Sequence, residues 1–95
     1  MKPILISLGD PAGIGPEVTF KAIKLIKNHP GILIFGHPNT IPKSIEPYSN
    51  NIGPNELKYI AIEPELKPQK SFNDKTNALI AYKSILTALE FSQNH

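Results

Sequence analysis

One stretch near the amino terminus has the residue types and spacing of a ligand-binding turn: Gly9-Asp10-Pro11-Ala12-Gly13-Ile14-Gly15-Pro16-Glu17. Its three glycines permit positive φ angles and the close approach of another group, while its two prolines stiffen the backbone between them. Pro16 suits the first turn of a helix, and Glu17 suits the positive end of the helix dipole. An apolar run precedes the stretch and an amphipathic run follows it, so the pattern predicts a strand-to-helix turn. In open α/β sheets, ligands bind beside such turns.

The spacing of the glycines argues against two common phosphate-binding loops. No Gly-Lys-Ser/Thr follows, as a P-loop requires, and Gly-x-x-x-Gly-x-Gly is not the dinucleotide fingerprint Gly-x-Gly-x-x-Gly. A purely structural turn, whose glycines only allow tight packing of strand and helix, remains open as an alternative.

The stretch from Gly9 to Glu17 resembles the opening signature of the 4-hydroxythreonine-4-phosphate dehydrogenase family. Weaker similarity continues through the run ending at Gly36 and the segment from Asn77 to Ser92. The resemblance implies the N-terminal part of an isopropylmalate dehydrogenase-like fold. It also implies an oxidoreductase of pyridoxine biosynthesis, which uses NAD to oxidise 4-phosphooxy-L-threonine before decarboxylation. Members of the family need a divalent metal held by histidines and act as dimers whose active site draws on both subunits.

The same likeness implies a cofactor site in the turn. Related dehydrogenases place a similar Gly-Asp-Gly-Ile-Gly-Pro-Glu turn beside the nicotinamide, so Asp10, Gly13, Ile14 and Gly15 are the expected NAD-binding residues. Backbone groups and the Ile14 side chain would make the contacts. For Asp10, capping of the turn by its own side chain is an equally weighted alternative. We expect Glu17 to be a dipole partner, and we assign no catalytic residue.

The metal and substrate residues of the family do not carry over to this sequence. Family members are several times longer, and their metal histidines, His-Thr substrate pair and basic phosphate-binding residues correspond to positions beyond His95. The histidines present, His29, His37 and His95, lack the i,i+3 or i,i+4 spacing of a helical metal pair. We therefore expect solvated loop histidines. His37 also replaces an acidic residue found there in many relatives.

Three functions of different class remain open. The first is an amino-terminal, truncated piece of the dehydrogenase, inactive alone because hydride transfer needs cofactor site, metal and positioned substrate together. The alternative is a non-catalytic interaction module that pairs with itself or with a full-length relative. A third is an anion or nucleotide binder at the turn, which the lack of a lysine there disfavours.

The turn requires a strand before it and a helix after it, and the hydropathy pattern supplies both. Apolar runs predict strands, apolar residues at helical spacing predict helices, and Asn73 or Asp74 offers an N-cap to the second helix. We expect one partial α/β domain over residues 1–95, with an incomplete parallel βαβ sheet, because two helices cover three strands poorly. The predicted elements are strand 2–8, helix 16–28, strand 31–36, loop 37–56 with a helical turn near 41–45, strand 57–62 and helix 74–92.

Periodicity also predicts which face each helix buries. For the first helix the predicted core residues are Val18, Ala22, Leu25 and Ile26, with Glu17 and Lys21 forming an exposed pair. For the second, the predicted core residues are Ala78, Ala81, Tyr82, Ile85, Ala88 and Leu89.

Composition narrows the class of partner. Ten basic and eight acidic residues leave a net charge of +2, which is too small to indicate nucleic acid or an anionic membrane as a partner. The chain has no cysteine, and no stretch approaches the ~20 apolar residues of a membrane span. A signal-peptide pattern is also lacking. We therefore expect a cytoplasmic protein.

Overall fold

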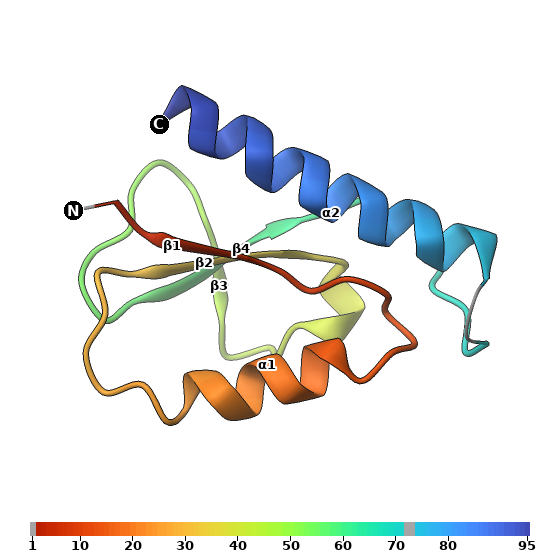
Figure 1. Ribbon diagram of the computed structural model, residues 1–95, viewed down its shortest axis with the longest axis horizontal. Coiled ribbons are helices and arrows are strands. Elements are labelled where there is room, and N and C mark those ends of the chain that lie inside the picture. Colours follow the sequence, from red (N-terminus) through yellow and green to blue (C-terminus); the bar gives the residue numbers. More distant parts are fainter. Residues whose placement is uncertain (1, 72–73) are drawn as a thin grey trace.

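A parallel sheet between two helices forms the molecule in the computed structural model, which describes residues 2–71 and 74–95 (Figure 1). The sheet has the order β1-β2-β4-β3, and each pair of neighbouring strands is parallel. This architecture confirms the predicted α/β class with an incomplete parallel βαβ sheet. The elements are β1 (Ile4–Ser7), α1 (Gly15–Ile23), β2 (Ile32–Gly36), the 3₁₀ turn η1 (Pro38–Thr40), β3 (Glu46–Pro47), β4 (Leu57–Ala61) and α2 (Lys75–Asn94).

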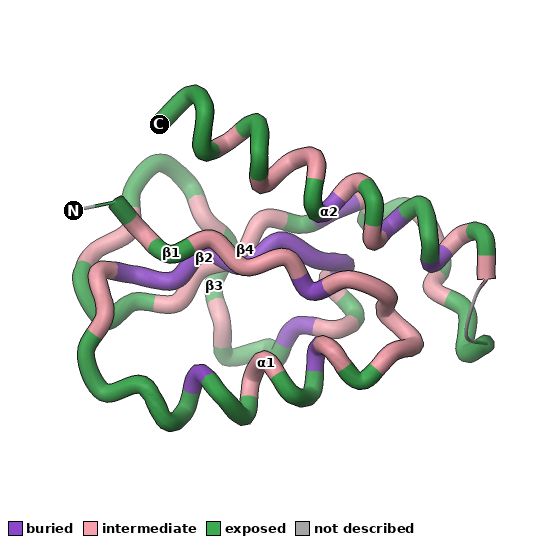
Figure 2. Tube along the Cα trace, in the orientation of Figure 1, coloured by how far each residue is buried: buried purple, intermediate pink, exposed green. Residues whose placement is uncertain are grey.

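The centre of the core is β2, which is buried along its whole length (Figure 2). Ile32 and Ile34 pack on one face of the sheet with Ile23 of α1. Leu33 and Phe35 pack on the other face, where α2 lies. A strand covered on both faces needs an uninterrupted apolar run, which is what this segment supplies.

The first helix is shorter than predicted and buries a different face. Instead of spanning 16–28, α1 ends at Ile23 and buries Pro16 and Ile23, while Val18 is half-exposed and Leu25 is 82% exposed. The predicted core face was therefore wrong. The cause of this different face is local. A Cβ on Gly15 would lie 2.8 Å from the Leu8 carbonyl oxygen, so the start of α1 packs directly against the end of β1. That contact fixes the rotation of α1.

The predicted core face of the second helix is also largely exposed. Tyr82 is 60% exposed, and Ile85 and Leu89 are exposed as well. Asn77, which is fully buried, fixes the rotation instead. Its Oδ1 accepts a hydrogen bond from the Gln69 N–H at 2.9 Å, and its Nδ2 donates to the Gln69 carbonyl at 2.7 Å. A buried amide must keep such partners, and this requirement outweighs the apolar periodicity.

Residues further along α2 complete its packing. Ile80 and Ser84 are fully buried, and Phe91 meets the ring of Phe35 edge to face at a centroid distance of 5.8 Å. The predicted N-cap is confirmed at Asp74, whose Oδ1 accepts from the Thr76 N–H at 2.8 Å, while Asn73 lies outside the described residues. In the described parts of the chain, no helix is both long and apolar enough to cross a membrane.

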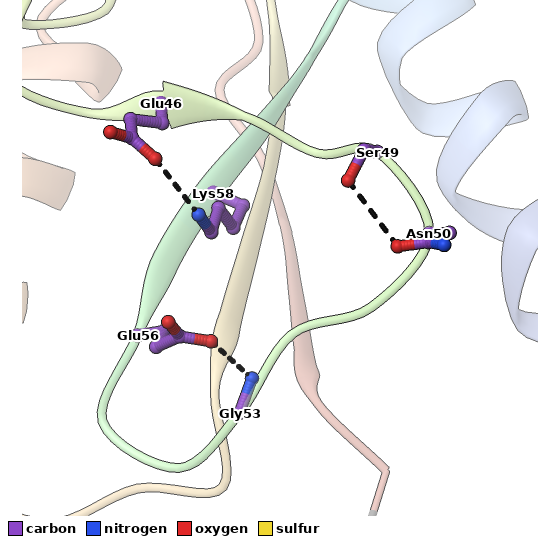
Figure 3. A network of polar contacts seen from close by, with 6 residues as sticks. All are labelled: Glu46, Ser49, Asn50, Gly53, Glu56 and Lys58. Atoms are coloured by element: carbon purple, nitrogen blue, oxygen red, sulfur yellow. Dashed lines mark hydrogen bonds and ion pairs between the residues drawn. The ribbon is translucent and has the colours of Figure 1, made fainter.

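The segment predicted as loop 37–56 contains two short elements. The single helical turn is η1, which starts earlier than the predicted 41–45, and β3 pairs with β4. Lys58 of β4 holds β3 by an ion pair to Glu46 at 3.2 Å (Figure 3). A two-residue strand that contains Pro47 gives no periodic signal, and proline is tolerated there because β3 lies at the edge of the sheet.

A pair of adjacent substitutions tests the observed face of α2. Ile80→Ala should lower the free energy of unfolding by about 2–5 kcal/mol, because it empties a fully buried site. Leu79→Ala, at a side chain 42% exposed, should cost less than about 1 kcal/mol. Urea denaturation of dilute protein measures both. Equal losses would contradict the observed rotation of the helix.

Candidate functional site

The carboxyl ends of the parallel strands meet at one edge of the sheet. The turn from Gly9 to Gly15 follows β1, His37 follows β2, and Glu63 comes shortly after β4. Figure 1 shows the turn leaving the end of β1 and entering α1. Because ligands of open α/β sheets bind at this edge, these segments form the candidate site.

Asp10 shapes the turn through its own side chain. Its Oδ1 accepts a hydrogen bond from the Ala12 N–H at 2.8 Å, and its carbonyl accepts from the Gly13 N–H at 3.0 Å. Gly9, directly before it, has a φ of +78°, a left-handed conformation that favours glycine. The capping alternative for Asp10 therefore describes what this carboxylate does in the structure.

The first turn of α1 leaves backbone donors available. Ile14 is the N-cap residue and provides no side-chain hydrogen bond to the helix, although the first N–H groups of a helix need partners. The Ile14 side chain itself is 73% exposed. Glu17 lies in the first turn and pairs with Lys21 at 3.1 Å, as predicted. The turn thus combines a helix start that has no side-chain cap with an exposed apolar side chain.

Ser7, the last residue of β1, places a polar group without a hydrogen-bond partner in the described chain shortly before the turn. Its hydroxyl oxygen is buried and has no hydrogen-bond partner among the residues that the structure describes. Such a group costs about 1–3 kcal/mol when unpaired. No pattern in the sequence marks this position, because a single serine within an apolar strand is ordinary.

The histidines have structural partners, and the expectation that all three are solvated was wrong for His37. His37 is buried, its Nε2 donates to the Leu66 carbonyl at 2.7 Å, and its Nδ1 accepts from the Asn39 N–H at 3.1 Å. His29 accepts from a backbone N–H, and exposed His95 stacks on an aromatic ring. Within residues 2–71 and 74–95, no three His, Asp or Glu side chains are grouped to hold a metal ion.

Two carboxylates close to the end of β4, Glu63 and Glu65, were not among the residues predicted for the site. A hydrogen bond with the Glu65 carboxyl raises the pKa of Glu63, and burial and the charge of Glu65 add to the effect. The pKa of Glu65 is lowered by a backbone hydrogen bond and by the same contact with Glu63. The two carboxyls therefore shift each other's pKa in opposite directions. The spacing Glu-x-Glu after a strand was the available signal.

The four predicted cofactor residues follow β1 and lie at the edge of the sheet where the strands have their carboxyl ends. Asp10 and Gly13 are tied into the turn by hydrogen bonds, while Ile14 and Gly15 begin the helix. Two surface hollows lie at the opposite edge, one of them lined by Lys2, Leu5 and His95 among others.

Comparison with known proteins identifies no family for this chain. No protein-family model matches the chain, and no curated protein matches its sequence. The dehydrogenase resemblance therefore stays a prediction from the sequence.

Substitution of Asp10 tests its structural role. Asp10→Ala removes the acceptor for the Ala12 N–H and should lower the free energy of unfolding by about 0.5–1.5 kcal/mol. Asp10→Asn keeps a side-chain oxygen and should stay within about 0.5 kcal/mol of the parent. Chemical denaturation of the three proteins measures this. Equal stability of Asp10→Ala and the parent would rule the cap out.

The pKa of the Glu63 carboxyl can be measured by carbon NMR of the side-chain carboxyls against pH. Glu65→Ala removes both the hydrogen bond and the neighbouring charge, so the pKa of Glu63 should fall toward its ordinary value. Lys83→Gln removes a cation that lowers the pKa of Glu63, so here that pKa should rise. Shifts in the same direction would contradict the contact.

Proposed function

We propose that this chain forms part of the cofactor-binding site of an NAD-dependent dehydrogenase similar to 4-hydroxythreonine-4-phosphate dehydrogenase. Alone, the chain does not transfer hydride. The observation that supports this best is the exposed Ile14 at the uncapped start of α1, at the carboxyl end of β1. A flat apolar ligand can pack on this side chain, because ligand sites are lined mainly by apolar and aromatic side chains.

The residues of the turn fit a nicotinamide nucleotide by their chemistry. The N–H groups of Gly15 and Glu17, at the positive end of α1 where no side chain caps the helix, can donate to carbonyl or phosphate oxygens, and Ile14 can pack against a ring. Gly15 keeps the backbone close to the end of β1, where the buried hydroxyl of Ser7 lacks a partner in the described chain. When bound, NAD would supply the acceptor for a hydride from the alcohol carbon of the substrate.

The described residues do not fit the divalent metal that the family uses. No group of three potential ligand side chains is present among them, and His37 is committed to Leu66 and Asn39. We infer that the metal and the substrate would be held by groups outside these residues. The chain would therefore orient the cofactor, while positioning of the alcohol requires a further polypeptide segment.

An interaction module that pairs with itself or with a full-length relative is the second candidate. The apolar stripes of both helices favour it, since Leu25 beyond α1 and Tyr82 on α2 are more than half exposed. Monomeric proteins seldom expose such stripes without use. The two functions are compatible, because a chain that only orients the cofactor needs another polypeptide to position the substrate. For either function we propose a cytoplasmic setting, where an NAD pool is present.

Titration of the isotope-labelled chain with NAD tests the cofactor proposal by NMR. The amide signals of Gly13, Ile14 and Gly15 should shift as NAD reaches millimolar concentration, which corresponds to about −4 kcal/mol of binding. Ile14→Ala should weaken the response by removing the apolar contact, whereas Leu79→Ala, an exposed apolar side chain on α2, should leave it unchanged.

A parallel assay with NAD, a divalent metal and 4-phosphooxy-L-threonine should show no NADH formation by the chain alone. Shifts spread over the whole surface, or none at the turn, would overturn the cofactor assignment. Formation of NADH by the isolated chain would overturn the proposal that a further polypeptide segment must position the substrate.

A further inference from the structure

His37 joins the two segments that leave the sheet at the ends of β2 and β4. The residue is buried, with 2% of its surface exposed. Its Nε2 donates to the Leu66 carbonyl at 2.7 Å, in the segment between β4 and α2. Its Nδ1 accepts from the Asn39 N–H at 3.1 Å, so the ring is also the N-cap of η1. One imidazole therefore holds both segments in place.

These two contacts fit only one protonation state of the ring. A carbonyl oxygen can only accept, so Nε2 must carry a hydrogen, and a backbone N–H can only donate, so Nδ1 must be unprotonated. Both conditions hold for the neutral imidazole with its hydrogen on Nε2. A second proton, on Nδ1, would set two N–H donors against each other and leave the Asn39 N–H without an acceptor.

The charged groups near the ring do little to offset a positive charge there. The segment after β4 contributes Glu63 and Glu65, α2 contributes Lys83, which acts on Glu63, and η1 has no ionisable side chain. The pKa of Glu65 is lowered by a backbone hydrogen bond and by Glu63, and to a smaller extent by the charge of His37. Because Glu65 is exposed, water screens its attraction for the ring. A buried imidazolium at this position would therefore be poorly compensated.

Fixed contacts on both sides of Leu66 limit how much of the chain the ring can release. Before it, the Ile62 N–H donates to the Gly36 carbonyl at 2.9 Å, which continues the pairing of β4 with β2. After it, the Gln69 backbone is held by the buried amide of Asn77. None of these groups titrates, so movement is confined to η1 and residues 63–68 when the ring leaves its site.

We propose that His37 is a pH-sensitive latch at the carboxyl edge of the sheet. While the ring is neutral, it closes η1 and residues 63–68 against the end of β2. When a proton from solvent adds to Nδ1, the imidazolium moves into water, the Asn39 N–H loses its acceptor, and residues 63–68 separate from β2. Only hydrogen bonds break in this step. The latch uses groups of the described chain alone, so it does not depend on NAD binding.

The latch lies next to the candidate site. A Cβ on Gly36, the residue before His37, would lie 2.7 Å from Cδ1 of Leu8, so the ends of β1 and β2 are in contact. The turn that begins at Gly9 follows Leu8 directly. Opening of the latch would therefore loosen the edge of the sheet at which the turn lies.

Proton uptake sets the direction and the steepness of the response. An exposed imidazole takes up its proton near about pH 6.5. The open form, whose ring is in water, binds the proton better than the closed form, so acid favours opening and higher pH favours closure. Below about pH 6.5 the ratio of open to closed chain should rise by up to about tenfold for each pH unit, because one proton is taken up.

Nitrogen NMR of the histidine rings and amide hydrogen exchange of the isotope-labelled full chain, followed from about pH 8 to about pH 5, test the latch. At the upper end the His37 ring should be neutral with its hydrogen on Nε2. After correction for intrinsic exchange, the protection of the Asn39 amide should fall at least about tenfold by the lower end. The Ile32 amide, bonded to the Glu56 carbonyl at the opposite end of the sheet, should keep its protection.

Two variants remove the proton site and keep part of the hydrogen bonding. His37→Gln has an amide that can donate to the Leu66 carbonyl, and His37→Asn keeps an acceptor for the Asn39 N–H; in both, protection of Asn39 should no longer depend on pH. The matched control is His29→Gln. The His29 Nδ1 accepts from the Gly31 N–H at 3.1 Å across the same two-residue spacing, but at the other end of the sheet. This variant should retain the pH dependence of the parent at Asn39.

Three results would overturn the latch. One is a His37 ring protonated on both nitrogens while the Asn39 amide stays protected, and another is a neutral ring with its hydrogen on Nδ1. The third is pH-dependent opening that survives in both His37 variants, which would assign the response to the carboxylates of Glu63 and Glu65. The first two readouts come from the parent chain, so they decide the outcome even where a variant does not fold.

Discussion

Complete enclosure of β2 is the constraint on which the rest of the structure depends. A parallel strand of five apolar residues is stable only with a strand on each side and a helix or loop over each face. β1 and β4 supply the sides, and α1 and α2 cover the faces (Figure 1). Among the described residues, no strand pairs with the outer side of β1.

Two small contacts then decide how the helices are turned. The close approach of Gly15 to the Leu8 carbonyl sets α1, and the bidentate amide contact between Asn77 and Gln69 sets α2. Each contact is steric or polar and involves little apolar area. Nevertheless, each directs a less apolar face inward and leaves an apolar stripe outside. A surface of that kind is uncommon on a self-sufficient monomer.

The two proposed roles lie at the same end of the sheet but use different strands. The carboxyl end of β1 leads into the turn, where Asp10 holds the backbone in shape and Ile14 stays exposed. The carboxylates after β4 and the buried His37 follow strands at the same end of the sheet, and they are held by contacts of their own. A ligand at the turn and a proton on His37 therefore act on separate groups.

Structural features that depend on residues close together in the chain could be predicted from the sequence alone. Apolar runs gave the three main strands, Asp74 gave the cap of α2, and Gly9 with its neighbours gave the turn, because each signal is local in hydropathy or backbone geometry. Tertiary structure alone decided which helix face is buried, why His37 leaves solvent, and where β3 pairs. These outcomes depend on single contacts between distant residues, such as His37 with Leu66, and no periodicity in the sequence encodes them.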